Sequence, residues 1–373
     1  MSCKTQALAI GGFGHVDALM IGGGSPVVIQ TMWKDRLSFS DVDGKAGRAL
    51  TERIGRLKAM GCGLLRFAVP DLEAAEVLGR LAAMVSMPLV ADIHFDYKIA
   101  LRCLDFPISK IRINPGNIGG RQKVEAVLGK AASKKIPIRI GVNAGSLPRD
   151  LRRGVEGGMD RAEALVEAAE RELAIFREWG FAGALVSIKA STIADTIKAN
   201  RLFRERSEVP LHIGVTEAGP LIAGTVRNTA ALVPLLAEGI GDTIRVSLSD
   251  AMENEVAAGR EILNAAAEMG SSRACRGVRI ISCPRCGRNG FDTHGFIDRW
   301  KERLYALQKP VTIAVMGCAV NGPGEAKCAD LGITGAGNSI LIFRNGRITR
   351  TMKIHNGDMS EADRAFTEEL ARL

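Results

Sequence analysis

Aromatic residues are scarce in this sequence: Phe, Trp and Tyr together make up 5% of its 373 residues. Proteins that bind single-stranded nucleic acid use aromatic side chains on which bases stack, and this chain has little material for such a surface. Long runs of Lys and Arg are missing too, although the formal net charge is +9. We therefore expect no nucleic-acid partner. Most of the charges belong on solvated helix faces, and an anionic small molecule is the remaining explanation of the basic excess.

Long hydrophobic runs are also absent, since no uninterrupted apolar stretch approaches the roughly 20 residues that a membrane span requires. The first residues, MSCKTQALAIGGFGHV, lack the apolar core and cleavage pattern of a signal peptide. We therefore expect a cytoplasmic protein without a membrane partner. Eight cysteines in such a chain favour metal or redox roles over disulfides.

Short apolar, β-branched segments recur through the first two-thirds of the chain, separated by segments of helical period. Eight of these segments read as strands: residues 27–32, 64–70, 89–95, 110–116, 138–145, 184–190, 211–219 and 243–249. Their near-continuous apolar character indicates burial on both faces and hence a parallel sheet. Eight such units within about 250 residues match a TIM-like (β/α)8 barrel. A doubly wound open sheet is the alternative, but no G-x-G-x-x-G follows the first strand.

Polar and charged residues stand at the ends of these predicted strands. They are Gln30, Arg66, Asp92, His94, Arg112, Asn114, Arg139, Asn143, Lys189, Glu217 and Ser247. Barrel active sites lie where the carboxyl ends of the strands meet. Three arginines and a lysine gathered there are costly to bury unless an anion compensates them, and guanidinium forks match phosphate oxygens. The sequence therefore favours a phosphorylated or diphosphate substrate over a purely structural ion network.

Two carboxylates among these residues, Asp92 and Glu217, are the candidates for acid–base work. The other interpretation is that Asp92 only pairs with an arginine and that His94 only caps the following helix.

A smaller α+β module follows the barrel. We expect the barrel to span residues 1–270, a linker to span 271–277 and the second module to span 278–373. The second module contains a strand near VRIISCPRCGR, a helix near DRWKERLYALQ, a strand VTIAVMG and a hairpin whose turn is Asn345–Gly346. A final helix begins with Ser360 as its expected N-cap.

Three cysteines of this module, Cys283, Cys286 and Cys318, lie at predicted strand ends. Such a set can hold zinc or an iron–sulfur cluster. A zinc ribbon requires a second C-x-x-C, which is absent, and the nearest further thiol is Cys328. A thioredoxin-type C-x-x-C leaves Cys318 without a role. The residues alone leave the fourth ligand open.

The motifs ISCPRCGR and VMGCAVNGPGEAK resemble those of the 4-hydroxy-3-methylbut-2-enyl diphosphate synthases, in their bacterial two-domain form. The barrel segments PVVIQTM, LLRFAVP, ADIHFDYKIAL, KIRINPGNIG, IRIGVNAGSL, SIKAS and DTIRVSLS resemble that family's strand-end motifs in the same order. The resemblance covers nearly the whole chain.

This resemblance implies a TIM-like barrel joined to a domain with one [4Fe-4S] cluster. The ligands that it implies are Cys283, Cys286, Cys318 and Glu325. It also implies reductive ring opening and dehydration of 2-C-methyl-D-erythritol 2,4-cyclodiphosphate, with flavodoxin or ferredoxin as electron donor. The implied assembly is a homodimer in which one chain's barrel faces the other chain's cluster domain.

The resemblance further implies roles for the strand-end residues. The diphosphate would be held by Arg66, Arg112, Asn114, Arg139, Asn143, Lys189 and Ser247. Glu217 would donate or accept a proton, with Asp92 and His94 in support. The segment WKDRLSFSDVDG after Met32 departs from the Thr/Asn-rich residues usual in the family, so the resemblance assigns it no role.

Two other functions fit parts of the pattern. One is a zinc-stabilised nucleic-acid-binding protein with Cys328 as the fourth ligand, which would be colourless. The other is a pterin-type barrel transferase with a structural metal site, which would turn over without an electron donor.

Overall fold

The computed structural model describes residues 5–274, 276–287, 289–319, 322, 324, 326–353 and 359–373. The chain divides into two compact units, Met1–Cys275 and Arg276–Leu373, and each is described by itself.

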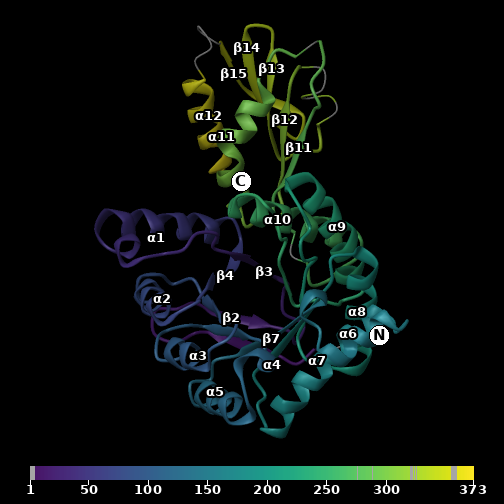
Figure 1. Ribbon diagram of the computed structural model, residues 1–373. Coiled ribbons are helices and arrows are strands. Elements are labelled where there is room, and N and C mark those ends of the chain that lie inside the picture. Colours follow the sequence, from purple (N-terminus) through teal and green to yellow (C-terminus); the bar gives the residue numbers. More distant parts are fainter. Residues whose placement is uncertain are drawn as a thin grey trace. The chain divides into compact units, whose positions relative to one another are not determined.

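Unit 1 is a barrel of eight parallel strands (Figure 1). The strands are β3 (Val28–Met32), β4 (Cys62–Ala68), β5 (Leu89–Asp92), β6 (Lys110–Ile113), β7 (Ile138–Asn143), β8 (Ala184–Lys189), β9 (His212–Ile213) and β10 (Thr243–Ile244). They neighbour one another in the order β8-β7-β6-β5-β4-β3-β10-β9. A bridge between Val186 and Leu211 connects the two ends of this order and closes the barrel. The predicted barrel and all eight strands are confirmed.

Helices follow the strands and surround them (Figure 1). They are α1 (Gly44–Ala59), α2 (Leu72–Met84), α3 (Tyr97–Cys103), α4 (Pro115–Ile118), α5 (Arg121–Ser133), α6 (Arg149–Glu156), α7 (Arg161–Glu178), α8 (Ile193–Arg206), α9 (Leu221–Ala237) and α10 (Met252–Glu268), with 3-10 turns η1 (Phe39–Val42) and η2 (Ala144–Ser146). Polar caps set several starts: Asp71 accepts from Ala74 N at α2, and Thr192 accepts from Asp195 N at α8.

A hairpin that the sequence did not predict closes the amino end of the barrel. It consists of β1 (Leu8–Gly11) and β2 (Ala18–Ile21), which pair antiparallel. The side chains of Leu8, Ile10 and Ile21 pack with residues from the barrel strands, including Leu64 and Leu185. The hairpin strands are only four residues long, which is too short for a two-residue period to stand out.

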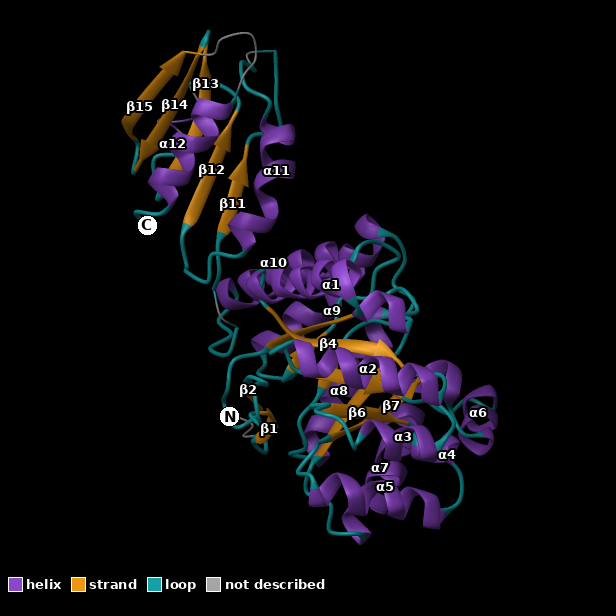
Figure 2. Ribbon diagram, turned by 90° about the vertical axis from the view of Figure 1, so that its left-hand side faces the viewer, coloured by secondary structure: helices purple, strands orange, loops and turns teal. Residues whose placement is uncertain are grey.

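Unit 2 is a five-stranded mixed sheet with two helices on one face (Figure 2). Its strands are β11 (Arg279–Ser282), β12 (Thr312–Met316), β13 (Leu331–Ala336), β14 (Ser339–Arg344) and β15 (Arg347–Lys353), and its helices are α11 (Thr293–Tyr305) and α12 (Ser360–Leu370). The first three strands run parallel, and β13, β14 and β15 run antiparallel.

The core of unit 2 lies between the sheet and these helices. Phe296 stacks on Trp300, and both meet the ring of Phe366 edge-on. The predicted turn at Asn345–Gly346 has the positive φ values, 48° and 75°, that favour Asn and Gly. Strand β13 was not predicted, because LGITGA has too many small residues to look like a strand. The expected N-cap at Ser360 is wrong by one residue, since Met359 occupies that position.

Asp242, at the amino end of β10, ties together three distant parts of unit 1. Its carboxylate accepts from Thr5 Oγ1 at 2.9 Å, Leu211 N at 2.7 Å and Arg273 Nη2 at 2.6 Å. The side chain is fully buried. Asp242 therefore joins the start of the chain to the segment that follows α10. Among the described residues, no helix is both long enough and apolar enough to cross a membrane.

We predict that Asp242→Asn lowers the free energy of unfolding by about 3 kcal/mol or more, because it leaves buried donors without their charged acceptor. Chemical denaturation measures the loss. Asp150→Asn is the control: both side chains of its pair with Arg171 are exposed, so we expect little change in stability. Equal losses in the two variants would contradict this role of Asp242.

Candidate active site at the barrel rim

A polar cavity of about 120 Å³ opens where the carboxyl ends of the barrel strands meet. It is lined by Arg66, Asp92, His94, Arg112, Arg139, Asn143, Lys189, Thr216, Arg245 and Ser247. Five of these ten side chains are cationic, and we call this cavity the rim pocket. Parallel strands bring their carboxyl ends to the same edge, which explains why residues from seven segments converge here.

The rim cations are buried although charged side chains ordinarily remain in water. Arg139 is 2% exposed, Arg112 5%, Lys189 6% and Arg66 8%. Their only carboxylate within the rim pocket is Asp92, itself 3% exposed. Arg112 Nη1 lies 3.2 Å from Asp92 Oδ1, and Arg66 Nε lies 3.7 Å from Asp92 Oδ2. One carboxylate therefore faces several buried positive charges.

Asp92 stays ionised in this setting. Burial by itself would raise its pKa, but Arg66, a hydrogen bond with His94 and Arg112 together lower the pKa below its ordinary value. His94 Nε2 lies 3.4 Å from Asp92 Oδ2, and its ring also meets Arg112 Nη1 at 3.0 Å. Asp92 thus forms the pairs with arginines that the second interpretation of the sequence described.

For the rim cations, a lowered pKa means that the charged form is disfavoured, whereas for Asp92 it means that the charged form is favoured. Burial is the main cause that holds the pKa of Arg139 well below its ordinary value, and the positive charges of Arg66 and Arg112 add to it. The pKa of Lys189 is also held well below its ordinary value, mainly by burial and further by the positive charges of Arg139 and Arg245. Burial also lowers the pKa of Arg66 to about 10, although Asp92 opposes this. Among the described residues, neither Arg139 nor Lys189 forms an ion pair, so the positive charge here exceeds its protein partners.

Two glycines provide the space in which these long side chains lie. A Cβ on Gly141 would stand 2.6 Å from Arg112 Nε, and one on Gly214 would stand 3.0 Å from Lys189 Nζ and 2.4 Å from the carbonyl oxygen of Arg245. Both glycines lie within segments that the sequence analysis predicted as strands. The sequence pattern did not indicate that they leave room for a neighbouring side chain.

Two of the expected barrel residues do not line the rim pocket. Asn114 caps α4, where its Oδ1 accepts from Gly116 N at 3.2 Å, and it lines a neighbouring cavity of about 480 Å³. Glu217 is exposed in the turn after β9, with a left-handed φ of 53°. The structure brings together the other eight: Arg66, Asp92, His94, Arg112, Arg139, Asn143, Lys189 and Ser247.

Sequence reasoning missed Arg245 and Thr216 in the rim pocket. The signal for Arg245 was available, because it stands two residues before Ser247 in TIRVSLS and side chains two apart share one face of an extended segment. Lys110 was also missed, and Gln30, which was expected at the rim, does not line the rim pocket: Lys110 Nζ donates to Gln30 Oε1 at 3.0 Å, and both residues are fully buried. Gln30 therefore serves the barrel interior.

The thiols of unit 2 lie at neighbouring strand ends. Cys283 directly follows β11 and Cys318 comes two residues after β12, and these strands pair in parallel with Ser282 beside Val315. Gly317 N donates to Cys283 Sγ at 3.0 Å. A Cβ on Gly317 would lie 3.1 Å from that sulfur, so the glycine permits the close approach of its backbone. Arg285, inside the C-x-x-C, has φ of 69°.

These residues fit a thiolate-bound iron centre in donor type, and Cys283 and Cys318 follow neighbouring strands. All six described cysteines are free, Cys286 and Cys328 are exposed, and backbone N–H groups commonly donate to cluster sulfurs. Over the part of the chain that the structure describes, no three His, Cys, Asp or Glu side chains are gathered closely enough to hold a metal ion. Glu325, the expected fourth ligand, lies outside the described residues.

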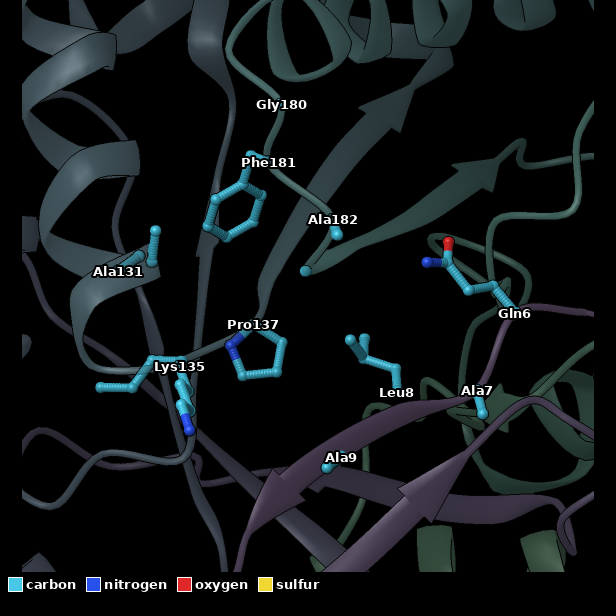
Figure 3. A pocket seen from close by; sticks show the side chains of 13 residues that line it. Gln6, Ala7, Leu8, Ala9, Ala131, Lys135, Pro137, Gly180, Phe181 and Ala182 are labelled. Carbon is cyan, nitrogen blue, oxygen red and sulfur yellow. The ribbon is translucent and has the colours of Figure 1, made fainter.

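Another cavity, of about 440 Å³, lies near the amino ends of the strands (Figure 3). Leu8 and Gln6 approach it from the hairpin segment, and Pro137, Lys135 and Phe181 approach it from the turns before β7 and β8. Lys135 is its only charged lining residue. This cavity lacks converging polar groups, so the rim pocket is the better candidate for chemistry.

The fold and its two polar centres define a class: a barrel with a cation-lined rim, joined to a small α+β unit that presents thiols at strand ends. Family models match both parts, the GcpE TIM-barrel domain over residues 14–260 and the GcpE protein C-terminal domain over residues 279–369. The chain belongs to the GcpE family.

Curated relatives match along nearly the whole chain. A protein of Treponema pallidum is 50% identical over 99% of this chain and 92% of its own length, and one of Geobacter sulfurreducens is 42% identical over 99% of both. Each is named 4-hydroxy-3-methylbut-2-en-1-yl diphosphate synthase (flavodoxin). Among solved structures, a dihydropteroate synthase of Coxiella burnetii covers 72% of this chain and 100% of its own at 13% identity, with a TM-score of 0.45, which is too distant to bear on the reaction.

We predict that Gly141→Ala weakens binding of inorganic pyrophosphate by about tenfold, because the new methyl group displaces Arg112 and costs one charged contact. Isothermal titration calorimetry measures this affinity. Gly129→Ala is the control, since a Cβ there meets nothing within 4 Å. Unchanged affinity in Gly141→Ala would show that Arg112 does not contact the anion.

We also predict that anion binding takes up protons. The pKa of Lys189 is low in the free protein and rises when a negative charge binds beside it, so at a pH between the two values the bound state holds more protons. Calorimetry of sulfate binding, in buffers of different ionisation enthalpy and over a series of pH values, measures the uptake, because sulfate has no titrating proton of its own in that range. Proton release on binding would contradict the predicted sign.

Proposed function

We propose that this protein is a 4-hydroxy-3-methylbut-2-enyl diphosphate synthase of isoprenoid biosynthesis by the methylerythritol phosphate route. It opens the ring of 2-C-methyl-D-erythritol 2,4-cyclodiphosphate and eliminates an oxygen: two electrons and two protons enter, and one water leaves. Relatives that are 42–50% identical carry this activity in their names. The two alternatives, a zinc-stabilised nucleic-acid-binding protein and a pterin-type transferase, have no such support.

The rim pocket is the observation that carries this proposal. Its lining holds five cations and one carboxylate, Asp92, which pairs with Arg66 and Arg112. Neither Arg139 nor Lys189 has an ion pair among the described residues. A buried charge excess of this kind is costly, and a compensating anion lowers that cost. A cyclic diphosphate supplies negative charge on two phosphoryl groups, and it places them where guanidinium forks donate in pairs.

In this proposal Arg66, Arg112, Arg139 and Lys189 bind the diphosphate, and Arg245 joins them. Asn143 and Ser247 supply neutral hydrogen-bond partners at the same rim. Asn114 belongs to the expected substrate-binding set as well, and its place beside the neighbouring cavity supports contact with a more distant part of the substrate.

The proton work is assigned to Glu217. Asp92 is a poor proton donor near neutral pH because its pKa is lowered, so it serves by holding Arg66 and Arg112 in place, with His94 against them. The exposed side chain of Glu217, at the rim-side end of β9, supports its role as the exchangeable acid or base.

Cys283, Cys286, Cys318 and Glu325 are the proposed ligands of a [4Fe-4S] cluster. When bound, this cluster supplies the two electrons one at a time, and flavodoxin, which the names of the relatives specify, is the proposed donor, with ferredoxin as the alternative. The hydrogen bond from Gly317 N to Cys283 Sγ stabilises a thiolate at that position.

We further propose a cytoplasmic homodimer in which residues 1–270 form the substrate domain, 271–277 the linker and 278–373 the cluster domain. Sedimentation of the anaerobically purified protein tests the assembly.

The proposed function is tested by anaerobic turnover of the cyclodiphosphate with reduced flavodoxin. We expect 4-hydroxy-3-methylbut-2-enyl diphosphate as product, dependence on the reductant, and iron and sulfide in the purified protein. Conversion without any electron donor, or zinc in place of iron, would contradict the proposal.

We predict that Cys328→Ser leaves the iron content and the visible spectrum near those of the parent protein, because Cys328 is not a ligand. Glu325→Ala should lose iron and activity together. Iron analysis and electron paramagnetic resonance measure both variants. Cluster loss in Cys328→Ser, with an intact cluster in Glu325→Ala, would assign the fourth position to the cysteine.

A further inference from the structure

Glu255 is a buried carboxylate beside the rim that neither the sequence motifs nor the rim pocket's lining included. It lies in the first turn of α10, and its side chain is 1% exposed. A carboxylate so fully removed from water requires charged or hydrogen-bonding partners. Glu255 has four partners: two lie in or just after β3, and two lie in the segment after β10.

The first two partners come from β3 and from the segment that follows it. Thr31 Oγ1 donates to Glu255 Oε2 at 2.5 Å, and Lys34 Nζ lies 2.5 Å from Oε1. Lys34 also donates to the carbonyl oxygen of Leu248 at 2.9 Å. The segment after Met32, which the family resemblance left without a role, is thereby attached to the segment after β10.

The other two partners come from that segment after β10. Leu248 N donates to Glu255 Oε1 at 3.0 Å, and Arg245 Nη2 lies 3.5 Å from the same oxygen. Arg245 is a rim-pocket residue with a side chain only 14% exposed. Its Nε has no hydrogen-bond partner among the described residues. Glu255 is therefore the carboxylate that pairs with one end of the Arg245 guanidinium, while Arg245 Nε keeps a donor that is free among the described residues.

Two carboxylates at the rim pair with three of its five cations. Asp92 holds Arg66 and Arg112, and Glu255 holds Arg245. A bare carboxylate so close to an anion site would repel the anion. Lys34 pairs with Glu255 and compensates its charge. Glu255 can therefore orient Arg245 with little repulsion between its carboxylate and the bound anion.

We propose that Glu255 is a positioning residue for the substrate: through Arg245 it sets the affinity of the rim pocket for a phosphoryl group, with Lys34 and Thr31 holding its carboxylate in place. The proposal rests on the proposed function for the identity of the substrate, whereas the anion-binding role is testable without it.

The test is a double-mutant cycle on the full-length protein, with binding of the cyclodiphosphate and of pyrophosphate measured by calorimetry. Glu255→Gln should weaken binding of both by about tenfold, since it replaces a charged contact to Arg245 by a neutral one. KM should rise correspondingly, with kcat changing by less than about threefold. In an Arg245→Gln background, the further change Glu255→Gln should weaken binding by less than about twofold, because the contact is already lost.

A merely structural role gives another pattern, since losses of stability and affinity would then add in the double variant. The matched control is Glu253→Gln, on the same turn of α10, whose carboxylate pairs with Arg53. Its affinity should equal that of the parent protein, and an equal loss there would attribute the effect to α10 as a whole and overturn the proposal.

Glu255→Asp covers the case in which Glu255→Gln fails to fold, because it keeps the charge but withdraws it from Arg245. We expect an intermediate loss of affinity, and affinity equal to that of the parent protein would overturn the proposal. Failure of the parent protein to bind the cyclodiphosphate while it binds pyrophosphate would instead remove the proposed function, and the comparison of variants with pyrophosphate would still decide the role of Glu255.

Discussion

Uncompensated positive charge at the barrel rim is the constraint on which the rest of unit 1 depends. Arg66, Arg112, Arg139 and Lys189 are each less than a tenth exposed, and one carboxylate, Asp92, serves two of them. Each charge out of water costs several kcal/mol unless a partner stabilises it. Burial of apolar side chains in the barrel, together with the contacts at its amino end, offsets that cost. The protein is thereby prepared for a ligand whose negative charge completes the arrangement.

The same constraint explains features that look unrelated along the chain. Gly141 and Gly214 leave room for the long side chains of Arg112 and Lys189, and Glu255 restrains Arg245 from a helix. In unit 2, a glycine again permits a close approach, that of the Gly317 backbone to Cys283. In both units, hydrogen-bond donors face positions where negative charge is expected. On the proposed function, that charge is on phosphate oxygens in unit 1 and on a thiolate in unit 2.

The sequence predicted much of this because barrel strands have a strong pattern and their last residues share one edge. Eight of the ten barrel residues expected at the site do line the rim pocket. The hairpin β1–β2 and strand β13 were missed because their segments are short or rich in small residues. Lys110 and Glu255 were missed because their importance arises from partners distant in sequence: Thr31 and Glu255, for example, are separated by 224 positions. Arg245 was missed although its position two residues before Ser247 places both on one face. Glu217 and Asn114 lie near the rim but outside the pocket, since each follows its strand in a turn.

The most direct test of the rim's role is the thermal midpoint of the full-length protein, compared with that of Arg139→Gln, with and without the cyclodiphosphate. Without ligand, Arg139→Gln should be at least as stable as the parent protein, because it removes a buried charge that lacks an ion pair. With ligand, the parent protein's midpoint should rise with concentration, and that of Arg139→Gln should rise far less. A large loss of stability in ligand-free Arg139→Gln, together with an undiminished response to ligand, would contradict the account.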